Sequence, residues 1–169
     1  MIIRQEQPHD YDSVYQVVKT AFATAEQSDG TEQDLVAALR NSNAFIPQLS
    51  LVAICDEKIV GHILFTKVTV GKEIALALAP LSILPSYQRQ GIGQALIAEG
   101  HRIARKLGYQ YAIVLGHPHY YPKAGYQPAS LYGIQAPFEV PDDSFMAIKL
   151  NSTAQPLVGI VEYDPAFGI

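Results

Sequence analysis

The segment covering residues 81–115 constrains the fold more than any other part of the chain. A short apolar run at 81–84 is followed by Pro85, a turn with the sequence Gln-Arg-Gln-Gly-Ile-Gly, a stretch with apolar residues at helical spacing, and a second apolar run at 109–115. A strand, a crossover helix and a strand in succession lie parallel in one sheet. We therefore expect the strands at 81–84 and Tyr111–Leu115 to run parallel.

The crossover helix carries a glycine, Gly100, on its apolar face. A glycine in an exposed helix interior costs about 1 kcal/mol relative to alanine. Its position on the apolar face therefore predicts that the helix backbone packs closely against the sheet.

Two earlier patterns predict helices. Apolar residues at i, i+3, i+4, i+7 and i+8 from position 14 predict a first helix that ends near Phe22. Thr31 can cap a second helix, whose apolar side is formed by Leu35, Val36 and Leu39.

Strand-like patterns complete the chain. Three runs rich in β-branched and aromatic residues predict antiparallel strands: 51–55, 59–70 and 74–84. Pro80 lacks a backbone N–H and indicates a bulge or a sheet edge in the third of them. Late runs at 145–150 and 159–163 predict two more strands. A chain of 169 residues suits a single domain over 1–169. We expect an α+β three-layer domain with a mixed, mostly antiparallel sheet and helices on both faces.

Composition excludes several classes of function. The formal net charge is −4 and the pI is near 5.7, so the protein as a whole has no general attraction for nucleic acid. No stretch reaches the roughly 18 uncharged apolar residues that a membrane span needs, and the first residues lack the apolar region of a secretion signal. The single cysteine, Cys55, gives secretion no support. We expect a cytoplasmic protein without a nucleic-acid or membrane partner.

The charge is unevenly distributed along the chain. Between Ile83 and Gly125 there are five Arg and Lys residues and one acid, whereas the remainder carries seven basic and fifteen acidic residues. The basic window is a candidate site for an anion. The alternative is a basic helix face in water.

The turn at residues 88–93 is a candidate phosphate site. The first N–H groups of a helix have no partner inside the helix, and two glycines allow a phosphate to approach the backbone. The alternative is a sharp turn that needs glycines for its geometry only. An ATP-binding P-loop would need a lysine after Gly93, and a dinucleotide fingerprint would need Gly or Ala at Leu96 and an acid within 100–138, where the sequence has none.

Residues Gln88, Gly91 and Gly93 match the signature Gln/Arg-x-x-Gly-x-Gly/Ala, and the sequence resembles the GCN5-related N-acetyltransferases there. The lead-in Leu-Ser-Ile-Leu-Pro looks like the end of that family's fourth strand. Downstream, the segment Tyr-Pro-Lys-Ala-Gly-Tyr, which begins at Tyr121, is similar to the family's Tyr-x-Lys-x-Gly-Phe. Further stretches are similar to the bacterial YhbS-type subgroup, so the resemblance covers most of the chain and implies a GNAT-like acyl-CoA N-acyltransferase fold.

The resemblance implies acetyl-CoA as a co-substrate, held where the fourth and fifth strands separate. The backbone of Leu81, Ser82 and Ile83 would bind the acetyl carbonyl and the pantetheine arm. Backbone amides of the turn would hold the pyrophosphate, which accounts for the basic window. The turn residues are Gln88, Arg89, Gln90, Gly91, Ile92, Gly93 and Gln94. Arg89 and Lys123 would add positive charge, whereas we expect Arg102 and Arg105 to be solvated.

The resemblance also implies the reaction: a neutral amine attacks the thioester directly, without an acyl-enzyme. Removing a proton from the amine, stabilising the oxyanion and protonating the sulfur are the three tasks. By position, Tyr121 matches the tyrosine that donates to the sulfur of CoA. A phenol with a pKa near 10 keeps its proton at neutral pH.

The sequence does not decide which residue is the general base. Glu32, near the start of the second helix, is the first candidate, because the first two helices form much of the acceptor site in this fold. Its alternative role is an acid that favours the helix dipole. His117 and His119 follow the fifth strand and are of the residue type most often used as a general base, and we name His119 beside Glu32. A metal is not expected, since neither a thiolate cluster nor a His-Glu-x-x-His helix is present.

The expected acceptor is a small molecule or peptide that carries a primary amine, and its identity is not legible in the sequence. The acidic remainder of the chain would suit a cationic acceptor. The main alternative is a non-catalytic module that binds or senses acyl-CoA. Exposed late strands would allow two copies to pair in a homodimer.

Overall fold

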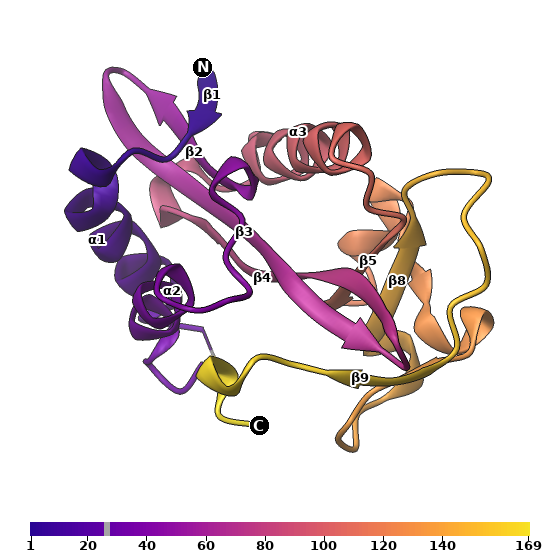
Figure 1. Ribbon diagram of the computed structural model, residues 1–169. Coiled ribbons are helices and arrows are strands. Elements are labelled where there is room, and N and C mark those ends of the chain that lie inside the picture. The colour runs from indigo at the N-terminus through magenta and orange to yellow at the C-terminus, as the bar shows by residue number, and fades with distance from the viewer. Residues whose placement is uncertain (26–27) are drawn as a thin grey trace.

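The structure is a computed structural model that describes residues 1–25 and 28–169. Among these residues lie three α-helices and nine strands (Figure 1). The helices are α1 (Tyr11–Phe22), α2 (Glu32–Arg40) and α3 (Ile92–Lys106). The strands are β1 (Ile2–Gln5), β2 (Ser50–Cys55), β3 (Lys58–Val70), β4 (Glu73–Ile83), β5 (Tyr111–Leu115), β6 (Gln127–Pro128), β7 (Ile134–Gln135), β8 (Phe145–Lys149) and β9 (Gly159–Glu162). None of the helices in the described ranges is long and apolar enough to cross a membrane.

The sheet is mixed and mostly antiparallel, as expected. Its strands follow the order β1-β2-β3-β4-β5-β8-β6, and β4 and β5 are the parallel pair on this path. Figure 1 shows α3 on one face of the sheet and α1 and α2 on the other. Alternate residues of β3 supply both cores: Ile63 and Phe65 pack on the side of α3, and Leu64 packs with Val14 and Val18 of α1. This confirms the three-layer α+β arrangement.

The close approach predicted from Gly100 is confirmed. A Cβ at this position would overlap the ring of Phe65 in β3, so α3 lies against the sheet at a distance that a larger side chain would not permit. The helix thereby fixes the position of its own first turn, which contains the glycines at 91 and 93.

The strand that contains residues 81–83 runs parallel to β5, as expected. The pairing joins Leu76 to Ala112 and Ala77 to Ile113, whereas residues 81–84 have no pairing with β5. The reason is that β4 separates from β5 after Ala77. At the same point the pairing of β4 with β3 shifts by one residue around Pro80, which confirms the predicted bulge. Residues 79 and 80 have no assigned partner in β3 at this irregularity, so the missing N–H of Pro80 falls where the ladder is already interrupted.

Thr31 precedes α2 as predicted, but it does not cap the helix with its side chain. Its hydroxyl donates to Oδ1 of Asp29 at 2.6 Å instead. The loop therefore folds on itself before the helix begins, and the helix starts at Glu32.

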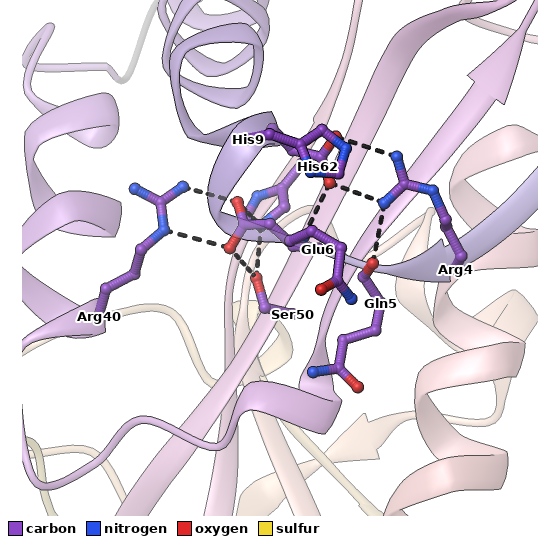
Figure 2. Close-up of polar contacts among 9 residues, drawn as sticks. Arg4, Gln5, Glu6, His9, Arg40, Ser50 and His62 are labelled. Carbon is purple, nitrogen blue, oxygen red and sulfur yellow. Dashed lines mark hydrogen bonds and ion pairs between the residues drawn. The ribbon is translucent and has the colours of Figure 1, made fainter.

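A buried polar cluster ties α2 to the sheet (Figure 2). The guanidinium of Arg40, at the end of α2, donates to both carboxylate oxygens of Glu6, at 3.1 and 2.6 Å. The hydroxyl of Ser50 in β2 donates to the same carboxylate and lies 3.0 Å from Nε2 of His62 in β3. Glu6 and His62 are almost fully buried, so the cluster fixes α2 against β1, β2 and β3.

Candidate active site

A cavity of about 700 Å³ opens where β4 separates from β5, and it extends to the first turn of α3. Its lining comes from the end of β4, the turn before α3, and the segment after β5. The lining residues are Leu81, Ile83, Tyr87, Gln88, Arg89, Gly91, Ile92, Gly93, Gln94, His117, Tyr120, Tyr121 and Lys123. We call it the cofactor cavity.

The first turn of α3 has the geometry of an anion site. Gly91 precedes the helix with φ at +86°, in the left-handed region that suits glycine, and the first helical hydrogen bond runs from Ala95 N–H to its carbonyl. Within the described chain, the N–H groups of Ile92, Gly93 and Gln94 donate to no acceptor. These free donors and the helix dipole face a cavity that also contains Arg89.

Nine of the eleven residues predicted for the cofactor site line this cavity. The other two are Ser82 and Gln90. The Ser82 side chain is buried and its hydroxyl has no hydrogen-bond partner, whereas Gln90 is exposed and donates to the carbonyl of Ser86. For Ser82 the predicted role is a backbone one, which its side chain does not affect.

Sequence reasoning missed Tyr87 and Tyr120 as lining residues. A Cβ on Gly93 would overlap the Tyr120 hydroxyl, so this glycine leaves room for a tyrosine that is 27 positions later. Neither tyrosine lies in a recognisable motif position, and the contact with Gly93 is visible only in three dimensions.

The positive charge at the cofactor cavity comes from Arg89 and Lys123, the pair expected from the sequence. Both residues line the cavity. Arg102 instead pairs with Glu99 at 2.6 Å on the outer surface of α3, and Arg105 donates to the carbonyl of Leu150. Of the five basic residues in the window, two therefore line the cavity, two interact elsewhere, and Lys106 is exposed outside the cavity.

Tyr121 lies at the inner end of the cofactor cavity. Its ring packs edge-on against Tyr120 and Tyr126, with centroids 5.1 and 5.8 Å away, and covers Gly116, where a Cβ would overlap it. Burial raises the pKa of the Tyr121 phenol well above its ordinary value of 10, and Tyr120 adds to the shift. The phenol is thus a proton donor over the whole range around neutrality.

A second cavity, of about 590 Å³, lies between β4, β5 and the first two helices. We call it the acceptor cavity. Its described lining consists of Phe22, Ala25, Ser28, Glu32, Leu35, Leu78, Ala79, Pro80, Leu81, Leu115, Gly116, His117 and Tyr121. Leu81, His117 and Tyr121 line both cavities, so the two meet where β4 and β5 separate.

Glu32 lines this second cavity. It accepts a hydrogen bond of 2.7 Å from the hydroxyl of Ser28, which fixes its orientation. Asp34, two residues later in the same helix, lies outside this cavity, and its carboxylate accepts a hydrogen bond from the Tyr15 hydroxyl.

The two histidines after β5 differ in position. His117 lines both cavities, whereas exposed His119 lines neither. In a strand these two residues, at i and i+2, would share a face, but the chain turns at residues 118–120 and their side chains separate. Within the described residues no group of three His, Cys, Asp or Glu side chains is arranged to hold a metal ion.

Comparison with known proteins agrees with this geometry. The sequence profile of the Acetyltransferase (GNAT) family matches residues 11–126. The uncharacterized N-acetyltransferase YjhQ of Escherichia coli K12 is 42% identical over 132 residues, which cover 75% of this chain and 73% of YjhQ. The uncharacterized N-acetyltransferase YhbS of the same strain is 30% identical over 171 residues, covering 99% of this chain and 98% of YhbS.

Solved structures resemble the fold along its whole length. The crystal structure of YhbS from Escherichia coli in complex with CoA has a TM-score of 0.90 and 27% identity, covering 99% of this chain and 92% of that one. A GNAT family acetyltransferase from Brucella melitensis in complex with acetyl-CoA has a TM-score of 0.82 and 32% identity, covering 98% and 97%. The chain therefore belongs to the GNAT family and is an acyltransferase of the N-acetyltransferase type.

Proposed function

We propose that the protein transfers the acetyl group of acetyl-CoA to a primary amine, by direct attack in a ternary complex. The observation that carries the proposal is that two cavities meet at Leu81, His117 and Tyr121. One has the free amides of a helix start, and the other has a carboxylate. A thioester at the junction would be accessible to an amine from the opposite side.

Acetyl-CoA occupies the cofactor cavity in this proposal. Its pyrophosphate lies at the free N–H groups of residues 92–94, with Arg89 and Lys123 beside it. The pantetheine arm lies along β4 after Ala77, where the backbone has no strand partner on the side of β5. The complexes of the Escherichia coli relative with CoA and of the Brucella melitensis relative with acetyl-CoA support this assignment.

The chemical step uses groups of both cavities. The nitrogen of the neutral amine forms a bond to the thioester carbon, and the resulting tetrahedral oxyanion collapses as the carbon–sulfur bond breaks. Glu32, directly or through water, takes the proton that the nitrogen loses, and the Tyr121 phenol donates a proton to the sulfur. The products are an acetamide and CoA with a free thiol.

Two residues share the remaining task of handling the amine proton. Glu32 is held by Ser28 in the acceptor cavity, and His117 stands at the junction of both cavities. We propose Glu32 as the base and His117 as the residue that orients the amine or passes on its proton. The catalytic role expected for His119 from the sequence stays a prediction, and the comparison of histidine variants described below tests it.

Calorimetry with acetyl-CoA, CoA and NADH tests the cofactor assignment. We expect binding of both CoA species at micromolar levels and none of NADH. An initial-rate study with a panel of amines then tests transfer, and lines that intersect on varying both substrates support a ternary complex. If the CoA species bind and no amine is acetylated, the non-catalytic acyl-CoA module replaces the proposed enzyme.

Variants assign the two main roles. We expect Tyr121→Phe to lower kcat by about 100-fold or more, with the affinity for acetyl-CoA unchanged. Glu32→Gln should lower kcat/KM for the amine, and Asp34→Asn is its matched control on the same helix. Equal effects of the last two would contradict the role of Glu32.

A further inference from the structure

We propose that the acceptor is an alkyl or arylalkyl monoamine, whose apolar body fills the acceptor cavity and carries no second charge. This inference rests on the proposed acetyl transfer and names its substrate class. It follows from the chemistry of the cavity wall, from the number of charges on it and from one exposed leucine.

The wall of the acceptor cavity is apolar on three sides. Phe22 of α1 and Leu35 of α2 form one side, Leu78 and Pro80 of β4 form another, and Leu115 of β5 closes the third. Leu78 and Pro80 follow Ala77, in the part of β4 that has no pairing with β5, and both line the cavity. A charged group placed against these side chains would lose its hydration without gaining a partner.

Leu115 is the clearest sign of an apolar occupant. It is 49% exposed at the mouth of the cavity, although the four residues before it in β5 are buried. An aliphatic side chain that faces a concave apolar wall remains in contact with water until an apolar group covers it. The body of the acceptor would be that group.

The charges of the cavity fit one ammonium. Glu32 is the one carboxylate among the described lining residues, and no lysine or arginine is among them. Asp29 and Asp34 line a neighbouring cavity that shares Glu32 and Leu35 with this one, and their carboxylates already accept hydrogen bonds from Thr31 and Tyr15. Against the lining residues that the structure describes, the second ammonium of a polyamine and the carboxylate of a free amino acid would each be unpaired.

A matched pair of acceptors tests the inference. Hexylamine and 1,5-diaminopentane have the same number of heavy atoms and differ in one end, which is a methyl group in the first and an ammonium in the second. The diamine has two reactive ends, so its kcat/KM is first divided by two. We then expect kcat/KM to be at least tenfold higher for hexylamine, which corresponds to a difference of about 1.4 kcal/mol between the two acceptors. Phenethylamine should behave like hexylamine.

A variant of the wall should reverse this preference. Leu115→Glu places a second carboxylate at the mouth, on a side chain that is already half exposed. We expect it to raise kcat/KM for the diamine and to lower that for hexylamine. Leu131→Glu is the matched control, because Leu131 is 69% exposed and does not line the cavity. It should leave both values unchanged.

Binding separates this inference from the proposed function. The midpoint of thermal unfolding of the CoA-loaded protein is measured with each amine, so the result does not depend on turnover. A shift with hexylamine that exceeds the shift with the diamine supports the inference, even if no acetylation occurs and the proposed enzyme is wrong. Acetylation that favours the diamine, spermidine or lysine overturns the inference and leaves the proposed function intact.

Discussion

The ring of Tyr121 occupies the space in which a Cβ on Gly116 would lie, so this glycine determines where the phenol stands. Gly116 directly follows β5, and its N–H donates to the carbonyl of Ser144 at 2.9 Å, which holds the backbone in place. Gly116, which lies outside the signature at residues 88–93, therefore positions the tyrosine that we propose as the general acid.

Gly116→Ala should displace the phenol from the thioester sulfur. We expect kcat to fall by about tenfold or more, because small misplacements of a reacting group are costly, while the affinity for acetyl-CoA changes little. In the double variant with Tyr121→Phe, the second change should add almost no further loss, since both remove the same proton donor. Two losses that multiply independently would contradict this positioning role.

Gly93→Ala should weaken cofactor binding through Tyr120. The added methyl group overlaps the Tyr120 hydroxyl, while the nearest ring carbon, Cζ, stays 3.4 Å away. The ring must therefore move within the cofactor cavity. We expect the Kd for CoA, measured by calorimetry, to rise by about threefold to tenfold.

Tyr120→Phe is the matched change for this prediction. It removes the overlapping oxygen, so the double variant Gly93→Ala/Tyr120→Phe should bind CoA more tightly than Gly93→Ala alone. A Kd that stays as high in the double variant would show that the methyl group acts on the cofactor directly and not through the tyrosine.

The pair His117→Gln and His119→Gln decides which histidine acts in the reaction. His117 lines both cavities and His119 lines neither. We expect kcat/KM for the amine to fall by about tenfold in the first variant and by less than about twofold in the second. A larger loss in His119→Gln than in His117→Gln would show that His119, the histidine named from the sequence, acts on the amine.

Much of the fold follows from periodicity and residue type. The helices, the antiparallel strands, the bulge at Pro80 and the close packing at Gly100 are local patterns or consequences of one residue's size. The point at which β4 leaves β5 is not predictable in this way, because it depends on which of many apolar residues find a partner strand. The parallel orientation of the two strands was predicted from the sequence and is confirmed, but the pairs that join them, at Leu76 and Ala77, are known only from the structure.

The candidate site also has some features that the local sequence predicts and others that only the three-dimensional structure shows. A motif such as the one at 88–93 is legible because its glycines and helix start have a local physical reason. The contacts of Tyr120 with Gly93 and of Tyr121 with Gly116 join residues through space. The inward direction of His117 depends on the path of the chain after β5. No periodic signal in the sequence reports these three facts.

The ion pair between Arg40 and Glu6 should be important for stability. The side chains are 11% and 1% exposed, and Arg40 also lies 4.0 Å from the centre of the Tyr11 ring. Arg40→Met leaves a buried carboxylate without its cation, and we expect a loss of about 3 kcal/mol in the free energy of unfolding in urea. Adding Glu6→Gln should recover part of this loss, because the buried charge is then gone. No recovery would mean that the methionine, and not the unpaired charge, causes the loss.

The buried histidines should make the protein less stable in mild acid. Burial lowers the pKa of His62 and that of His101 to about 4, and Arg105 adds to the shift of His101. In the unfolded chain each has a pKa near 6.5, so the unfolded state binds more protons than the folded state between these two values. Stability contributed by the neutral rings is complete above pH 6.5 and is lost progressively as the pH falls toward 4.

A comparison of the wild type with His101→Gln isolates one of these groups. His101 shares a hydrogen bond of 2.9 Å with the Tyr126 hydroxyl, which glutamine can also make. Between about pH 7.5 and about pH 5.5, the wild type should lose about 1 kcal/mol more of its unfolding free energy than the variant. The measurement is urea unfolding at both pH values, with the difference taken within each protein so that a uniform effect of the substitution cancels. Equal losses in the two proteins would show that His101 is protonated in the folded state without cost.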